Sequence, residues 1–252
     1  MKREEHDGQT WVDCSICGQM FPVEKWMETL CEDADFRHCD VCISRLNEEQ
    51  KQRERRENLP RLAAAAGIPD GYRIDRQTGK PFTAPPKPHV ARWIWENRDR
   101  NLLISGATGM GKSTGACWAA LRMLEAGKSV RYVKLRRLLA EWRTARTSDE
   151  PMAEDRFFGR IHGLDLLILD EVADKKKTTE SGQEMMYELL DMICDGELPT
   201  RLWMLGNFRQ GVLEEVFGDA DPVYRRIEEN FLCAGAEEKS MQRFRACTNN
   251  RA

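Results

Sequence analysis

A glycine-rich run, Gly106-Ala107-Thr108-Gly109-Met110-Gly111-Lys112-Ser113, has the spacing G-x-x-x-x-G-K-[ST]. Glycines at these positions let backbone N–H groups point toward phosphate oxygens, and a helix that follows adds the partial positive charge of its N-terminus. Lys112 would reach the β- and γ-phosphates, and the Ser113 hydroxyl would bind Mg²⁺. The run therefore predicts an ATP–Mg²⁺ site formed by Gly106, Ala107, Thr108, Gly109, Met110, Gly111, Lys112, Ser113 and Thr114.

Two carboxylates follow the apolar run at residues 166–169, namely Asp170 and Glu171. The carboxyl end of a buried strand is where open α/β sheets bind ligands. Asp170 would hold the metal, and Glu171 would orient and deprotonate the attacking water. Asn207 follows another apolar run, and its amide could bond the γ-phosphate or that water. Its alternative role is simply to form a turn.

Two cysteine pairs, Cys14-Ser15-Ile16-Cys17 and Cys39-Asp40-Val41-Cys42, are separated by 21 residues. Four thiolates in tetrahedral geometry make a closed, structural zinc site. Cys31 and His38 are possible substitutes for one ligand. A metal-free cluster of buried cysteines is the alternative, but some forty residues cannot easily build a core unaided. The sequence therefore predicts Zn²⁺ bound by Cys14, Cys17, Cys39 and Cys42.

The elements that would position these residues alternate along the chain. Apolar runs at residues 101–104, 130–133, 166–169 and 202–205 are separated by helix-like segments, which predicts an α/β fold with a doubly wound parallel sheet. Residues 43–66 favour a charged helix interrupted near Pro60, and prolines follow as far as Pro88. We therefore expect a zinc-binding module at 1–45, a helical and proline-rich linker at 46–88, and a nucleotide-binding domain at 89–252.

The distribution of charge along the chain indicates different partners for its different parts. The net charge is −3, and residues 1–42 carry four Lys or Arg against ten Asp or Glu. An acidic module favours docking of a protein over nucleic acid, because phosphates are bound mainly by Lys and Arg. For single-stranded DNA the better candidates are Lys134, Arg136 and Arg137, or the basic run at residues 175–177. No run of 18 uncharged apolar residues occurs and the start lacks a secretory signal, so we expect a cytoplasmic protein without a membrane partner.

Several short motifs, in this order and spacing, resemble the AAA+ ATPases of the DnaC/DnaI type, to which the IstB transposition helpers are close relatives. They are Gly67-Ile68-Pro69, Gly106 to Ser113, Leu164 to Glu171, Leu198-Pro199-Thr200 before Asn207, Val216 to Asp219, and Tyr224 to Ile227. The resemblance covers roughly residues 62–245. The chain departs from it at Leu205-Gly206-Asn207, where Thr-Ser-Asn is usual, and at Ile193-Cys194, where an Arg-Tyr pair is usual.

This resemblance implies an AAA+ core with a P-loop whose subunits associate through the ATP site. Arg226 would be the arginine finger, with Arg225 as the alternative. Arg243 or Arg245 would be the sensor arginine near the C-terminus. The implied activity is ATP hydrolysis by a loader of the replicative DNA helicase that also binds single-stranded DNA. A zinc-bound amino-terminal module that engages the helicase is part of the DnaI-type arrangement.

Two rival functions follow from the same residues. A transposition helper would share the ATPase core but typically lacks a zinc module, so the cysteine pairs favour the loader. An adaptor that holds ATP and barely hydrolyses it would not need Lys112, Asp170 and Glu171 intact. A metabolic kinase is disfavoured, because the sequence has no recognisable acceptor site.

Overall fold

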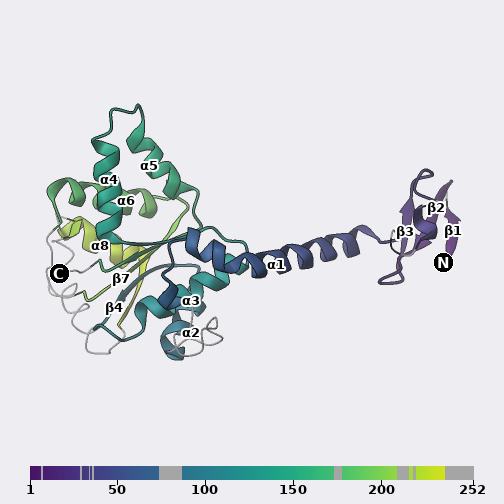
Figure 1. Ribbon diagram of the computed structural model, residues 1–252, viewed down its shortest axis with the longest axis horizontal. Coiled ribbons are helices and arrows are strands. Elements are labelled where there is room, and N and C mark those ends of the chain that lie inside the picture. The colour runs from purple at the N-terminus through teal and green to yellow at the C-terminus, as the bar shows by residue number, and fades with distance from the viewer. Residues whose placement is uncertain are drawn as a thin grey trace. The chain divides into compact units, whose positions relative to one another are not determined.

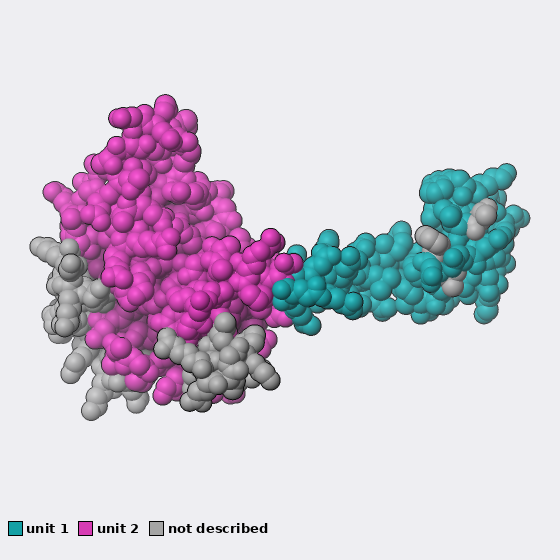
Figure 2. Space-filling view, viewed as in Figure 1, with its two compact units in different colours: residues 1–57 teal, residues 58–252 magenta. Residues whose placement is uncertain are grey.

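The computed structural model describes residues 1–6, 8–28, 30–33, 35, 37–73, 87–172, 178–208, 216–217 and 220–235. The chain divides into two compact units, Met1–Glu57 and Asn58–Ala252, shown in different colours in Figure 2. We call the first unit the head and the second the core unit. The proline-rich part of the predicted linker, the basic run at 175–177, and Arg243 and Arg245 lie outside the described residues.

The head contains a three-stranded antiparallel sheet of β1 (Arg3–His6), β2 (Gln9–Asp13) and β3 (Met20–Val23) in that order. A short 3-10 helix, η1 (Leu30–Glu32), follows. Among the described residues its apolar core is small: Val12, Val23 and Cys31 are buried, and Phe21 and Met27 pack against them. So few buried side chains stabilise a domain poorly, which leaves room for a metal to complete the fold.

Helix α1 (Asp40–Ala65) begins in the head and ends in the core unit. The predicted interruption near Pro60 is wrong, because the helix continues through that residue. A proline inside a helix removes one backbone hydrogen bond and strains the preceding turn. Packing compensates here: Ala63 and Ala66 are buried in the core unit, and Arg73 Nη1 donates to the Pro60 carbonyl at 2.9 Å.

The core unit contains a parallel sheet in the order β5-β6-β7-β4-β8. Four strands coincide with the predicted apolar runs: β4 (Asn101–Ser105), β5 (Val130–Lys134), β6 (Leu166–Asp170) and β7 (Arg201–Gly206). The fifth, β8 (Phe231–Gly235), was not expected; it is a short edge strand that pairs with β4. The predicted α/β class with a parallel sheet is confirmed.

Helices cover both faces of this sheet (Figure 1). The 3-10 helix η2 (Asp70–Tyr72) and helices α2 (Pro88–Glu96) and α3 (Lys112–Glu125) belong to one side. On the other side are α4 (Leu135–Arg146), α5 (Ala153–His162), α6 (Glu180–Cys194) and α8 (Ala220–Asn230). Successive strand residues face opposite sides, so Leu166 and Ile168 pack with α3 while Leu167 and Leu169 pack with α6. Within the described residues, no helix is long and apolar enough to cross a membrane.

The connection from α1 to the sheet passes very close to β5 at Gly67. Gly67 has φ +78°, and a Cβ at this position would lie 2.5 Å from the Tyr132 carbonyl oxygen. We predict that Gly67→Ala lowers the free energy of unfolding by about 1–3 kcal/mol, because it combines a left-handed backbone with a backbone clash. Chemical denaturation measures this free energy.

Gly159→Ala is the control. Gly159 lies in α5 with open space around its Cβ position, so alanine should be neutral or stabilising there by up to about 1 kcal/mol. Equal losses in the two variants would contradict the prediction.

Candidate nucleotide site and four-cysteine cluster

The glycine-rich loop connects β4 to α3, as its motif requires. Gly109 and Gly111 have φ of 85° and 90°, a left-handed conformation that favours glycine. Lys112 opens α3, and its Nζ donates to the carbonyls of Gly106 at 2.6 Å and Ala107 at 2.9 Å. Burial lowers the pKa of the Lys112 ammonium, which the nearby Asp170 carboxylate opposes. The loop thus presents a cation and the first turn of a helix at one point.

A cavity of about 720 Å³ opens at the carboxyl ends of the strands. Lys112, Ser113, Asp170, Glu171 and Asn207, predicted from three separate segments, all line it. Glycines 106, 109 and 111 and threonines 108 and 114 also line the cavity. Gly106 N–H donates to the Gly206 carbonyl at 3.1 Å, which connects the glycine-rich loop to the end of β7. The cavity is large enough for a nucleotide, since ligand sites commonly measure about 300–1,000 Å³.

The two carboxylates at the end of β6 differ in environment. Asp170 is 5% exposed; its Oδ2 accepts from the Tyr132 hydroxyl at 2.5 Å and its Oδ1 from the Glu171 N–H at 2.8 Å. Glu171 is half-exposed and its Oε1 accepts from Lys134 Nζ at 2.5 Å. Its φ of 57° is unusual for a residue other than glycine. Such backbone outliers are concentrated at functional sites. The geometry fits a fixed metal ligand at Asp170 and an accessible base at Glu171.

Five residues that were not assigned to the nucleotide also line this cavity: Tyr72, Lys87, Lys134, Arg136 and Gly206. Lys134 and Arg136 were candidates for DNA contact, but here they lie beside the nucleotide residues. Lys134 ends β5, the neighbour of β6, so a sheet order deduced from the sequence would have revealed it. Tyr72 follows the Gly67-Ile68-Pro69 motif, and nothing in the local pattern indicates that the chain returns to the cavity there.

The candidate arginine fingers lie on α8 rather than in the cavity of their own chain. The Arg226 side chain is 26% exposed; it forms an ion pair with Asp191 of α6, and its Nη1 donates to the Tyr187 hydroxyl at 3.2 Å. Its guanidinium also stands 5.2 Å from the centre of the Tyr187 ring. Arg225 is 79% exposed and pairs with Glu229 of the same helix at 2.9 Å. The two neighbours thus differ: Arg226 is held by α6, and Arg225 projects from the surface.

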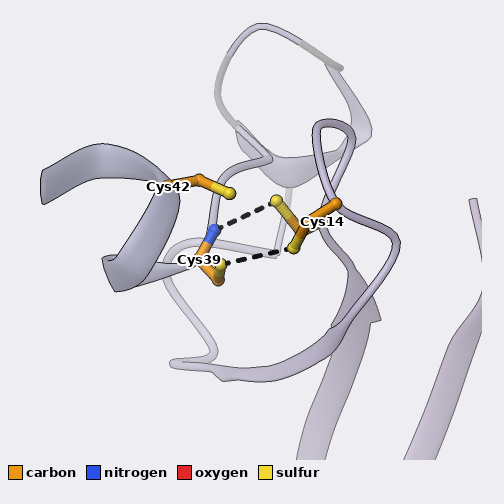
Figure 3. Close-up of side chains that lie close together, drawn as sticks. Cys14, Cys39 and Cys42 are labelled. Carbon is orange, nitrogen blue, oxygen red and sulfur yellow. Dashed lines mark hydrogen bonds between the residues drawn. The ribbon is translucent and has the colours of Figure 1, made fainter. Parts of the chain in front are cut away.

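The head brings its four predicted zinc ligands together, as Figure 3 shows for the labelled Cys14, Cys39 and Cys42. The Sγ atoms of Cys14, Cys17, Cys39 and Cys42 lie within 4.8 Å of one another. The Sγ atoms of Cys17 and Cys39 are 3.7 Å apart. A tetrahedral zinc with bonds of about 2.3 Å requires about 3.8 Å between sulfurs. The donor set therefore fits Zn²⁺.

Two local structures position these cysteines. In the first pair the chain makes a tight turn, with Gly18 at φ 74° and its N–H donating to the Cys14 carbonyl at 2.9 Å. The second pair lies at the start of α1, and the Cys39 N–H points at Cys14 Sγ at 3.4 Å. The cluster contains neither His38 nor Cys31 among the described residues, and Cys31 is buried in the apolar core of the head instead.

The thiols differ in how readily they ionise. Burial opposes ionisation of Cys14, but the backbone N–H groups of Cys17, Cys39 and Ile16 outweigh it and lower its pKa to about 6. Burial, followed by hydrogen bonds with the other three thiols, raises the pKa of Cys42. The four thiols are therefore not equivalent, and binding of a metal by all four requires Cys42 to lose its proton.

Comparison with known proteins gives one family. A family model described as IstB-like ATP-binding protein matches residues 28–220. No curated protein matches the chain. Among solved structures, AMPPCP-bound DnaA from Aquifex aeolicus is similar, with 18% sequence identity and a TM-score of 0.47. The matched region covers 60% of this chain and 45% of the DnaA chain. This chain thus spans less than half of that DnaA structure. The DnaC helicase loader is 13% identical, with 60% of this chain and 88% of the loader chain covered and a TM-score of 0.47. DnaI is 19% identical, with 66% of this chain and 93% of the DnaI chain covered and a TM-score of 0.46.

Proposed function

Because the chain belongs to the family of IstB-like ATP-binding proteins, we propose that it hydrolyses ATP to load a replicative DNA helicase onto single-stranded DNA. The observation that carries the ATPase part is the single cavity lined by Lys112, Ser113, Asp170 and Glu171. A phosphate loop, a buried acidic metal ligand and a half-exposed carboxylate at one sheet edge are the parts that hydrolysis of a phosphoanhydride needs.

In this proposal the triphosphate lies against the N–H groups of the loop and the first turn of α3, and Lys112 exchanges its carbonyl acceptors for phosphate oxygens. Ser113 and Asp170 would hold Mg²⁺, which neutralises phosphate charge when bound. Glu171 would take the proton of the attacking water, and Asn207, exposed at the end of β7, would contact the γ-phosphate or that water. Glu171 Oε1 accepts from Lys134 in this structure, so the proposal leaves Oε2 to take the proton or requires this ion pair to open.

The head supports a separate docking function. Its described residues include seven exposed large apolar side chains, with Val41 at 73% and Trp26 at 68%, whereas Met152 is the one such residue in the described part of the core unit. The other five in the head are Met1, Ile16, Leu30, Ile43 and Leu46. Scattered apolar exposure is ordinary, but its concentration in one small acidic unit favours a protein partner. We propose that the helicase binds to the head.

Single-stranded DNA and subunit association complete the proposal. Lys134 and Arg136 line the nucleotide cavity, so DNA contact falls to the basic run at residues 175–177, outside the described residues, and to the exposed Arg137. Self-association would place Arg226 of one subunit at the ATP of the next. The transposition helper remains the second candidate, because the matching family model is described as IstB-like.

A pull-down against the replicative helicase of the source, in the presence of ATP, tests the loader. We predict that the double variant Cys14→Ser, Cys17→Ser drops from about one zinc per chain to none, loses helicase binding and becomes protease-sensitive in the head, because a closed zinc site supplies folding free energy. Metal analysis and limited proteolysis check the first and last outcomes. ATP binding by the core unit should persist.

Cys194→Ser is the matched control, since Cys194 lies in α6 of the core unit and outside the cluster. It should keep both zinc and helicase binding. A wild-type protein that retains ATP and zinc but captures no helicase would overturn the loader and move the transposition helper to first place. Helicase binding by the zinc-free double variant would remove the docking role of the head.

A further inference from the structure

Two tyrosines that the mechanism above does not use lie behind the predicted metal ligands. Tyr132 is on β5, adjacent to β6, and its side chain is buried. Its hydroxyl donates to Asp170 Oδ2 at 2.5 Å. A phenol is protonated at neutral pH, so it is a lasting donor to the carboxylate. The other oxygen of Asp170 accepts only a backbone N–H, that of Glu171, among the contacts of the described residues.

Tyr72 lies near Ser113, the second predicted metal ligand. It lines the nucleotide cavity together with Ser113. Burial and the Asp170 carboxylate raise the pKa of the Tyr72 phenol, and the nearby Ser113 side chain opposes this shift. Its ring meets that of Tyr132 edge to face, with 6.3 Å between centres and 67° between planes. Of these two phenols in mutual contact, Tyr132 therefore bonds Asp170, and Tyr72 lines the cavity beside Ser113.

The backbone fixes this pair. Tyr132 N–H donates to the Ala66 carbonyl at 2.7 Å, and Gly67 lies against the Tyr132 carbonyl. Tyr72 N–H donates to the Pro69 carbonyl at 2.9 Å, which closes the turn that carries the ring. The segment 66–72, which contains Gly67-Ile68-Pro69, is thus attached to the same residue that bonds Asp170. Its close approach explains why glycine is needed at position 67.

We propose that Tyr132 and Tyr72 are positioning residues of the magnesium site, with Tyr132 orienting Asp170 and Tyr72 orienting Ser113. This inference rests on the proposed ATP–Mg²⁺ site. A carboxylate has about four acceptor positions, so Asp170 can accept from Tyr132 and from Glu171 N–H and still bind a cation. Partners that hold a metal ligand in place commonly change metal affinity by about 10–100-fold when they are removed.

The test measures the affinity of a fluorescent ATP analogue with Mg²⁺ and with EDTA. Tyr132→Phe keeps the buried ring and removes only the hydroxyl. We expect its metal-free affinity to stay within about twofold of wild type, while the gain in affinity on adding Mg²⁺ falls about tenfold and the Mg²⁺ concentration at half-effect rises similarly. Tyr72→Phe should show the same pattern. Thr144→Val, which removes an exposed hydroxyl on α4 that does not line this cavity, should leave the Mg²⁺ dependence unchanged.

The outcomes separate this inference from the proposed function. A wild-type protein that binds the analogue in a Mg²⁺-dependent way, with unchanged dependence in both tyrosine variants, would overturn the positioning role alone. Equal loss of binding with and without Mg²⁺ would also overturn it, because that pattern indicates a role in folding only. A wild-type protein that binds no analogue would overturn the ATP site and this inference together.

Discussion

Glu171→Gln is expected to leave ATP binding within about twofold of wild type and to lower the turnover number about 10²–10³-fold. Glutamine has nearly the same shape as glutamate but cannot accept a proton from water. The variant also removes the charge that pairs with Lys134. The measurement is steady-state phosphate release alongside the affinity of a fluorescent ATP analogue, with DNA and the partner present.

Glu197→Gln is the control, because Glu197 is exposed on the connection after α6 and does not line the cavity. Its turnover should equal that of wild type. The same experiment distinguishes an ATPase from an adaptor that holds ATP as a scaffold. Wild-type turnover as slow as that of Glu171→Gln, under conditions in which ATP is bound, would contradict hydrolysis and favour the adaptor.

The nucleotide loop and the cysteine cluster were predictable because the residues of each are close together in the sequence. Gly106 to Ser113 is contiguous, and its backbone geometry follows from glycine at fixed positions. The four cysteines occur as two close pairs, so only one long-range approach had to be inferred. The buried strands were equally clear, since a parallel sheet covered on both faces leaves uninterrupted apolar runs.

The residues that were missed depend on tertiary neighbours. Lys134 meets Glu171 because β5 lies beside β6, and Tyr72 enters the cavity because Gly67 permits a close pass of β5. The path of α1 through Pro60 depends on the burial of Ala63 and Ala66 against the core unit. These contacts join residues that are far apart in the sequence, and no pattern of neighbouring residues indicates them. Sequence analysis detects patterns of neighbouring residues best.

Arg226→Ala is expected to lower ATP turnover of the assembled protein about 10³-fold, with little change in the affinity of the single subunit for ATP. The ion pair with Asp191 and the contact with Tyr187 fix the direction of the Arg226 guanidinium on α8, and a preorganised arginine loses little freedom on meeting a γ-phosphate. Arg225→Ala is the matched control, because Arg225 is the adjacent, more exposed arginine of the same helix. Its turnover should change by less than about threefold.

Mixing two inactive variants tests whether the arginine acts across subunits. Glu171→Gln retains Arg226 but lacks the base, and Arg226→Ala retains the base but lacks the arginine. If Arg226 acts on the ATP of a neighbour, a mixed assembly contains interfaces with both groups intact, so turnover should recover to about a quarter of wild type at equal amounts. A loss in Arg226→Ala that mixing does not relieve would instead assign Arg226 to packing α8 against α6. Recovery with Arg225→Ala in its place, after that variant alone had lost turnover, would transfer the role to Arg225.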